Sequence, residues 1–157
     1  MFGVSDLEVL PILDPATDAA GRSSRAVSLK NYTGVIKLVV YVNQGNAATV
    51  LLTPEQCSAV AGTGNKAIAA APIFSAQDLA TTTVSVRATA AAAFTTSAAV
   101  LAKRVEFLID PSGMDVAGGF DCIRLTTGAS NVANITSAFI VARPKQAVEL
   151  GNNARVD

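Results

Sequence analysis

The side chains that could do chemistry are few, and the most suggestive are three aspartates around a glycine-rich turn, Asp110, Asp115 and Asp121. Calcium binds where several oxygen ligands converge, so this cluster is the one place in the sequence to consider a metal. The spacing does not follow the order of an EF-hand loop. Aspartate is also a common turn residue, because its side chain bonds the backbone two residues further on. We therefore predict that these aspartates form turns and bind no metal.

The remaining reactive residues lack the partners that catalysis needs. Histidine is absent, which excludes Ser–His and Cys–His pairs and the usual zinc sites. Cys57 and Cys122 lie far apart in the chain, and we expect two unrelated, reduced thiols in a protein made in the cytoplasm. The Gly-Thr-Gly at 62–64 is no phosphate loop, because no Gly-Lys-Ser/Thr follows it. Glu106 supports no reaction by itself. We predict no enzyme, no catalytic residue and no cofactor.

Composition and charge exclude several kinds of partner. The chain has 157 residues, with 12 Lys and Arg against 12 Asp and Glu. A nucleic-acid binder needs a surplus of cations, and a membrane-surface patch needs a dense basic run, so we expect neither partner. The N-terminus lacks the basic segment of a signal peptide, and the alanine-rich stretch 88–102 is too short and polar to span a bilayer. We expect one domain, not exported from the cytoplasm.

Short β-branched segments separated by turn residues indicate an all-β protein. The most apolar segment, Val35–Val42, is predicted to be a central strand covered on both faces and to form a hairpin with Val27–Leu29. A second hairpin is predicted between Val35–Val42 and Ala47–Thr53. The residues Thr53–Cys57 are expected to begin a helical turn. Further strands are predicted at Lys66–Ala70, Thr81–Ala88, Arg104–Asp110, Phe120–Thr127 and Ile135–Arg143.

These segments predict an antiparallel β-sandwich or jelly roll of about eight strands. Within Thr81–Ala88, alternation places Val84 and Val86 inward. The predicted core consists of Ile36, Leu38, Val40, Val105, Phe107, Ile123, Leu125 and Phe139.

The two ends of the chain differ from its middle. We divide it into an extended N-terminal arm at 1–25, a β-sandwich domain at 26–144 and a polar C-terminal tail at 145–157. Pro11 and Pro15 deny the arm a long helix. The arm could pack on its own domain as a strand, or dock on a neighbouring molecule; we hypothesise the second, with little contribution to its own core. The candidate contacts are Phe2, Val4, Leu7, Val9, Leu10, Ile12 and Leu13.

Four stretches of the sequence resemble small virion proteins of tailed bacteriophages. They are AVSLKNYTGVIKLVVYV, TVLLTPEQCSAVAGTGNKAI, VEFLIDPSGMDVAGGFDCIRLTTG and FIVARP, which fall within residues 26–144. The family is similar to capsid decoration, or cement, proteins. The resemblance implies a structural protein on the capsid surface of the virion. It would bind the major capsid protein and itself, as a homotrimer, and stabilise the shell.

Two other functions are compatible with the same residues. One is a different virion component, such as a tail or head-fibre base protein. The other is a carbohydrate-binding β-sandwich. The sequence has no Trp and only two Tyr, which counts against a sugar site because sugar faces stack on aromatic rings.

Overall fold

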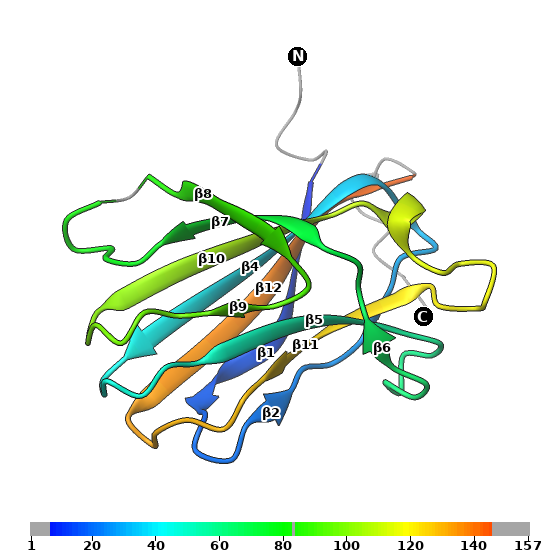
Figure 1. The fold of residues 1–157 in the computed structure, drawn as a ribbon. Helices are drawn as coiled ribbons and strands as arrows, with labels where there is room; N and C mark the ends of the chain where they lie inside the picture. The colour runs from blue at the N-terminus through cyan, green and yellow to red at the C-terminus, as the bar shows by residue number, and fades with distance from the viewer. Residues whose placement is uncertain (1–6, 83, 146–157) are drawn as a thin grey trace, which may run out of the picture.

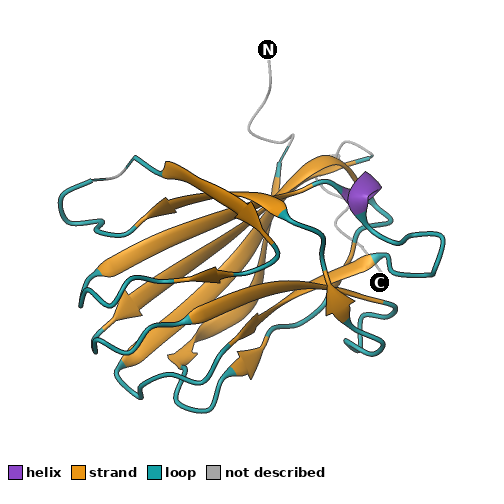
Figure 2. Ribbon diagram, in the orientation of Figure 1, coloured by secondary structure: helices purple, strands orange, loops and turns teal. Residues whose placement is uncertain are grey.

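The computed structural model describes residues 7–82 and 84–145, which form two antiparallel β-sheets and one short 3-10 turn (Figures 1 and 2). Twelve strands lie in the described residues, where the sequence predicts about eight. In chain order the elements are β1 (Glu8–Thr17), β2 (Arg22–Ser23), β3 (Val27–Ser28), β4 (Tyr32–Gln44), β5 (Leu51–Cys57), β6 (Lys66–Ala67), β7 (Ala71–Ala76), β8 (Val86–Ala91), β9 (Phe94–Thr95), β10 (Ala102–Ile109), the 3-10 turn η2 (Pro111–Gly113), β11 (Cys122–Thr127) and β12 (Asn134–Pro144).

The large sheet has the strand order β1-β12-β4-β10-β7-β8, and β4 lies between β12 and β10 (Figure 1). The predicted central position of Val35–Val42 is therefore confirmed. Its inward side chains, such as Ile36 and Leu38, are 0% exposed. The expectation of cover on both faces is wrong, because Val35 and Tyr41 on the other face are 56% and 42% exposed. Only one face of this sheet packs on the core.

The small sheet has the order β2-β11-β5-β6, with β3 also paired to β11 and β9 to β5. Its inward residues, including Leu52, Ile123 and Leu125, join one hydrophobic cluster with the inward residues of the large sheet. The two sheets thus form the two layers of a sandwich-like all-β fold, as Figure 2 shows.

Both predicted hairpins are wrong. Val27–Ser28 pairs with β11 in the small sheet, whereas β4 belongs to the large sheet. The connection from β3 to β4 therefore crosses between the layers, with Tyr32 N donating to Leu29 O at 3.0 Å and Gly34 at φ 72°. Strand β5 likewise pairs with β11, not with β4. Alternating apolar residues show that a strand faces the core, but they do not show from which layer.

The expected helical turn at Thr53–Cys57 is also wrong, because these residues are the second half of β5. Pro54 lies opposite Leu125 and Gln56 opposite Ile123 in the ladder with β11. Gln56 Nε2 also donates to Ala67 O at 3.0 Å. Pairing with β11 overrides the capping signal that the local sequence carries, since tertiary contacts routinely override local preference.

Seven of the eight predicted core residues are confirmed, and the eighth, Phe139, is wrong. Phe139 is half-buried on the outward side of β12. The residues of this strand that face the core are Ala138, Ile140 and Ala142. The confirmed residues are all 0% exposed: Ile36, Leu38, Val40, Val105, Phe107, Ile123 and Leu125.

The prediction that Val84 and Val86 point inward is wrong as well. Their side chains are 71% and 70% exposed. Val86 begins β8, the outer strand of the large sheet, whose one neighbour is β7. Further along β8, Ala88 and Ala91 pack against the core, whereas Val86 at the start of this edge strand stays exposed.

A buried aspartate ties β1 and β2 to β11 and β12. Asp18 follows β1 and is 0% exposed. Its carboxylate accepts hydrogen bonds from Thr127 Oγ1 at 2.9 Å and from Thr136 Oγ1, and it pairs with Arg22 Nε at 3.3 Å. The two threonine contacts join residues that are more than a hundred positions apart in the chain, so Asp18 fixes how the N-terminal strands meet the C-terminal ones.

A buried lysine closes one end of the core. Lys103 is 0% exposed, and its ammonium donates to Gln44 Oε1 and Ser97 O at 2.7 Å and to Ala99 O at 2.5 Å. Burial lowers the pKa of Lys103. The three acceptors satisfy the charge by hydrogen bonds, and Gln44 is itself 1% exposed. The amine therefore holds three segments together at this end.

We expect Lys103→Met to lower the free energy of unfolding at neutral pH by about 1–3 kcal/mol, because buried acceptors lose their donor. Urea denaturation measures this, with Lys37→Met as the exposed control, expected to cost at most about 1 kcal/mol. Because the folded-state pKa of Lys103 is lowered, the unfolded chain binds more protons just below the ordinary value of 10.5. The stability of the wild type relative to Lys103→Met should therefore rise with pH in that window, and a flat difference would contradict this.

Candidate functional site

The outward face of the large sheet carries a continuous set of apolar side chains. Because side chains alternate between the faces of a strand, residues in register with the exposed Val35 and Tyr41 share their face. One row across the sheet joins Val9, Val141, Lys37 and Leu108, and the next joins Pro11, Phe139, Val39, Glu106 and Phe74. We call this surface the outer face; its apolar members in β1, β12, β4, β10 and β7 are Val9, Pro11, Ile135, Phe139, Val141, Val35, Val39, Tyr41, Leu108 and Phe74.

Several of these side chains are open to solvent. Val9 is 59% exposed, Val35 56%, Tyr41 42% and Ile135 37%, and Leu7 just before β1 is 60% exposed. Single exposed apolar residues are ordinary on a protein surface. A set of exposed apolar residues that covers neighbouring strands of one sheet is unusual, and such patches mark sites where another molecule binds.

Three charged residues form a fixed group in the middle of the outer face. Glu106 forms two ion pairs: Lys37 Nζ lies 3.0 Å from one carboxylate oxygen, and Arg104 Nε lies 2.9 Å from the other. The Glu106 side chain is 13% exposed, so its negative charge is balanced mainly by these two cations and less by water. The residue therefore acts as the centre of an ion-pair group, and the group carries one surplus positive charge, from two cations and one anion.

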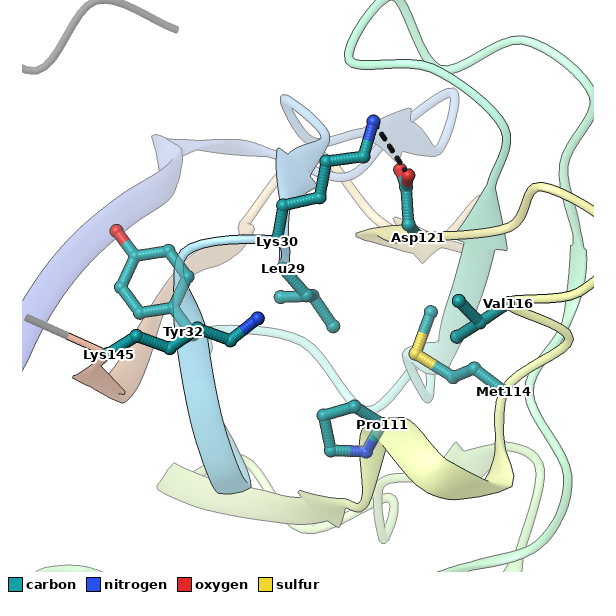
Figure 3. Close-up of a pocket in the computed structure, with 8 residues that line it drawn as sticks. All are labelled: Leu29, Lys30, Tyr32, Pro111, Met114, Val116, Asp121 and Lys145. Carbon is teal, nitrogen blue, oxygen red and sulfur yellow. Dashed lines mark ion pairs between the residues drawn. The ribbon is translucent and has the colours of Figure 1, made fainter.

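The structure also contains an apolar pocket, which Figure 3 shows in close-up. Its lining includes Tyr32 at the start of β4 and Pro111 just after the end of β10. It has a volume of about 280 Å³. At its rim, Lys30 Nζ lies 3.0 Å from Asp121 Oδ2. This ion pair raises the pKa of Lys30, and together with a bond from the Cys122 thiol it lowers the pKa of Asp121. The full lining is Leu29, Lys30, Tyr32, Pro111, Met114, Val116, Asp121 and Lys145.

Asp110 and Asp115 lie at turns, as predicted, whereas Asp121 directly precedes β11 and pairs with Lys30. Asp110 caps η2 by accepting from Ser112 N at 2.9 Å. Asp115 accepts from Gly118 N at 2.9 Å and pairs with the Lys66 ammonium. Within the described residues, no group of three or more His, Cys, Asp or Glu side chains could hold a metal ion. The same residues include no helix long and apolar enough to cross a membrane.

The prediction that the two cysteines are unrelated is wrong. Cys57 on β5 and Cys122 on β11 are direct partners in the register of the small sheet, and both are buried. Their proximity depends on which strands pair, and the sequence carries no signal of that pairing.

The candidate contact residues of the N-terminal arm divide into four groups. Leu7 and Val9 are exposed, whereas Ile12 and Leu13 are 2% and 6% exposed in the core. The hypothesis that the arm adds little to its own core is therefore wrong for Ile12 and Leu13. A shift in the β1–β12 register between Pro11 and Leu13 explains why two successive residues point inward.

The remaining candidate contacts complete this division. Leu10 is half-buried and packs against the core. Phe2 and Val4 lie outside the described residues, as does the tail beyond residue 145. Of the seven candidates, Leu7 and Val9 are thus the ones that the structure shows available for contact with another molecule.

Comparison with known proteins gives one informative match. No family model matches the chain, and no curated protein matches it. Among solved structures, the SPBc2 prophage-derived protein YomS is similar, with a TM-score of 0.50 and 10% sequence identity. The match covers 90% of this chain and 97% of that one. At this identity the likeness concerns the fold alone, and it shows that this chain has an all-β fold similar to that of YomS over most of its length.

Proposed function

We propose that this chain is a structural protein of a bacteriophage virion. In this proposal it sits on the capsid surface, binds the major capsid protein and its own neighbours as a homotrimer, and stabilises the shell. The observation that carries the proposal is the outer face, a broad apolar surface on a sheet whose other face already forms the core. Decoration requires such a surface, because each copy must gain free energy by covering apolar area on its neighbours.

Two further observations support a phage setting. The sequence stretches within residues 26–144 resemble phage decoration proteins. YomS, a prophage-derived protein, has a similar fold. The charges support a protein partner over nucleic acid, since cations and anions balance in the whole chain.

Side chains, rather than added strands, would carry most of the contact. Strand β1 is an edge of the large sheet, and an edge can accept a further strand from a partner. Backbone carbonyls of β1 already have other donors, because Arg25 N donates to Ile12 O at 3.0 Å and Arg22 Nη1 donates to Asp14 O at 2.9 Å, which disfavours continuous pairing along this strand. The exposed Leu7 and Val9 instead extend the outer face toward the N-terminus. Partner binding there would bury these side chains together with Val35 and Tyr41.

The proposal predicts that Val35→Asp weakens binding to the phage particle at least about tenfold, because a carboxylate must be desolvated at the contact. Val60→Asp is the matched control: Val60 is also 56% exposed but follows β5 in the small sheet. Binding is measured as co-sedimentation of the labelled protein with phage particles that do not contain this protein. Light scattering measures the molar mass in solution and so whether the homotrimer forms. Both variants should keep the wild-type melting temperature.

The outcomes separate the alternatives. Loss of particle binding in Val35→Asp but not in Val60→Asp supports the outer face as the contact surface. Equal binding of Val35→Asp and the wild type would overturn that assignment. If the wild type binds tails or fibre bases instead of capsids, the protein is a different virion component.

A further inference from the structure

The small sheet brings its two cysteines into a geometry that suits a covalent bond. Cys57 and Cys122 face each other across the antiparallel pair β5–β11. Directly opposed residues in such a pair have Cα atoms about 4.5 or 5.5 Å apart, depending on the hydrogen-bonding position. Disulfides usually join Cα atoms about 4.4–6.8 Å apart. Both kinds of opposed position therefore lie within the range of a disulfide.

The neighbouring pair on the same face shows that side chains do meet across these strands. Glu55 and Arg124 are opposed two residues along the ladder, and Arg124 Nε lies 2.7 Å from Glu55 Oε2. Because side chains alternate, the cysteines point to this same side of the sheet. The loop after β5 folds over it, and Arg124 Nη1 donates to Gly62 O at 3.2 Å. The thiols are consequently 0% and 2% exposed.

We propose that Cys57 and Cys122 form an intrachain disulfide when the folded protein meets a small oxidant such as hydrogen peroxide. In the first step a thiolate attacks peroxide, the O–O bond breaks, and a sulfenic acid and a hydroxide ion are produced; the hydroxide takes up the proton that the thiol released and becomes the first water. The second thiol then attacks the sulfenic sulfur. The S–S bond forms, the S–O bond breaks, and the hydroxyl leaves with the thiol proton as a second water. The thiol pair loses two electrons, which reduce the peroxide.

The charges around the pair decide how readily it reacts. Burial, a hydrogen bond to Asp121 and the charge of Asp121 raise the pKa of Cys122 to about 11. Burial also raises the pKa of Cys57. The positive charge of Arg124 acts against this rise, and the negative charge of Glu55 adds to it. Lys30 pairs with Asp121 and so offsets part of its charge. Little thiolate exists at neutral pH, so the reaction of the pair with peroxide is slow there and faster at higher pH.

Peptide mapping of the full-length protein tests the proposal. The folded protein is treated with a small excess of hydrogen peroxide at about pH 9, where more thiolate is present. We expect a peptide pair linked through Cys57 and Cys122 that has lost two hydrogens and separates on reduction. Mapping is preferred to whole-protein mass, because Met1 and Met114 also take up oxygen. The melting temperature of the oxidised protein should rise by about 5–10 °C, since the bond closes a long loop.

Single variants provide the controls. In Cys57→Ala the remaining thiol should proceed to sulfinic acid with no intrachain link, and in Cys122→Ala likewise. If either variant fails to fold, as judged by circular dichroism, the mapping of the wild type alone still decides. Oxidation of the folded wild type that yields only oxygen-bearing cysteines, or only links between chains, would overturn the proposal.

Discussion

Replacing Phe107 with alanine should lower the free energy of unfolding by about 3–5 kcal/mol. Phe107 lies on β10 opposite Leu38 of β4 and Ile73 of β7, and all three side chains are 0% exposed. The substitution removes the buried ring and leaves a cavity between the three neighbouring strands β4, β10 and β7, which surrounding side chains cannot fill unless the sheet shifts. Urea denaturation with a fitted m-value measures the change.

A matched control lies next to Phe107 on the same strand. Leu108 points to the outer face and is half-buried, so Leu108→Ala should cost clearly less, about 1 kcal/mol or below. If both variants lost similar stability, the assignment of the inward and outward faces of β10 would be wrong.

Replacing Asp18 with alanine should cost about 3–5 kcal/mol, the second large effect. The substitution leaves the hydroxyls of Thr127 and Thr136 without their acceptor and the Arg22 guanidinium without its buried anion. The effect should exceed that of an ordinary hydrogen bond, because the carboxylate is 0% exposed and joins both ends of the chain.

Asp14 provides the comparison for Asp18. Its side chain is 84% exposed and pairs with Arg25 at 3.7 Å, so Asp14→Ala should change the free energy of unfolding by at most about 1 kcal/mol. For Asp18→Asn, the loss in free energy of unfolding should lie between those of Asp18→Ala and Asp14→Ala, since the amide keeps the shape and one acceptor oxygen. An Asp18→Ala variant as stable as Asp14→Ala would show that the buried network contributes nothing.

Alternation within a single strand could be predicted from the sequence, and the choice of partner strand could not. The pattern of Val105, Phe107 and Ile109 predicts their burial, and all three are at most 1% exposed. The same pattern does not show which strands pair, so the sequence predicts hairpins of β3 and β5 with β4, whereas both strands pair with β11 in the other layer. Strand β7 has its two large apolar residues, Ile73 and Phe74, in succession, so its sequence shows no clear alternation that would predict a strand.

The candidate site shows the same division between local and long-range information. Leu7 and Val9 could be singled out because the sequence around them is apolar and lacks helical potential. The outer face could not, because its members come from five strands whose order the sequence does not state. The Asp18 network, the Glu106 ion-pair group and the opposed cysteines likewise depend on register between distant segments.

The most direct test of the central claim is cryo-microscopy of the phage particle that carries this chain. The proposal predicts density for the two-sheet domain on the outside of the capsid, arranged as trimers. The outer face around Val35 and Tyr41 should be covered by the major capsid protein or by a neighbouring copy. A particle without this chain, or one in which the chain is bound with that face fully open to solvent, would contradict the proposal.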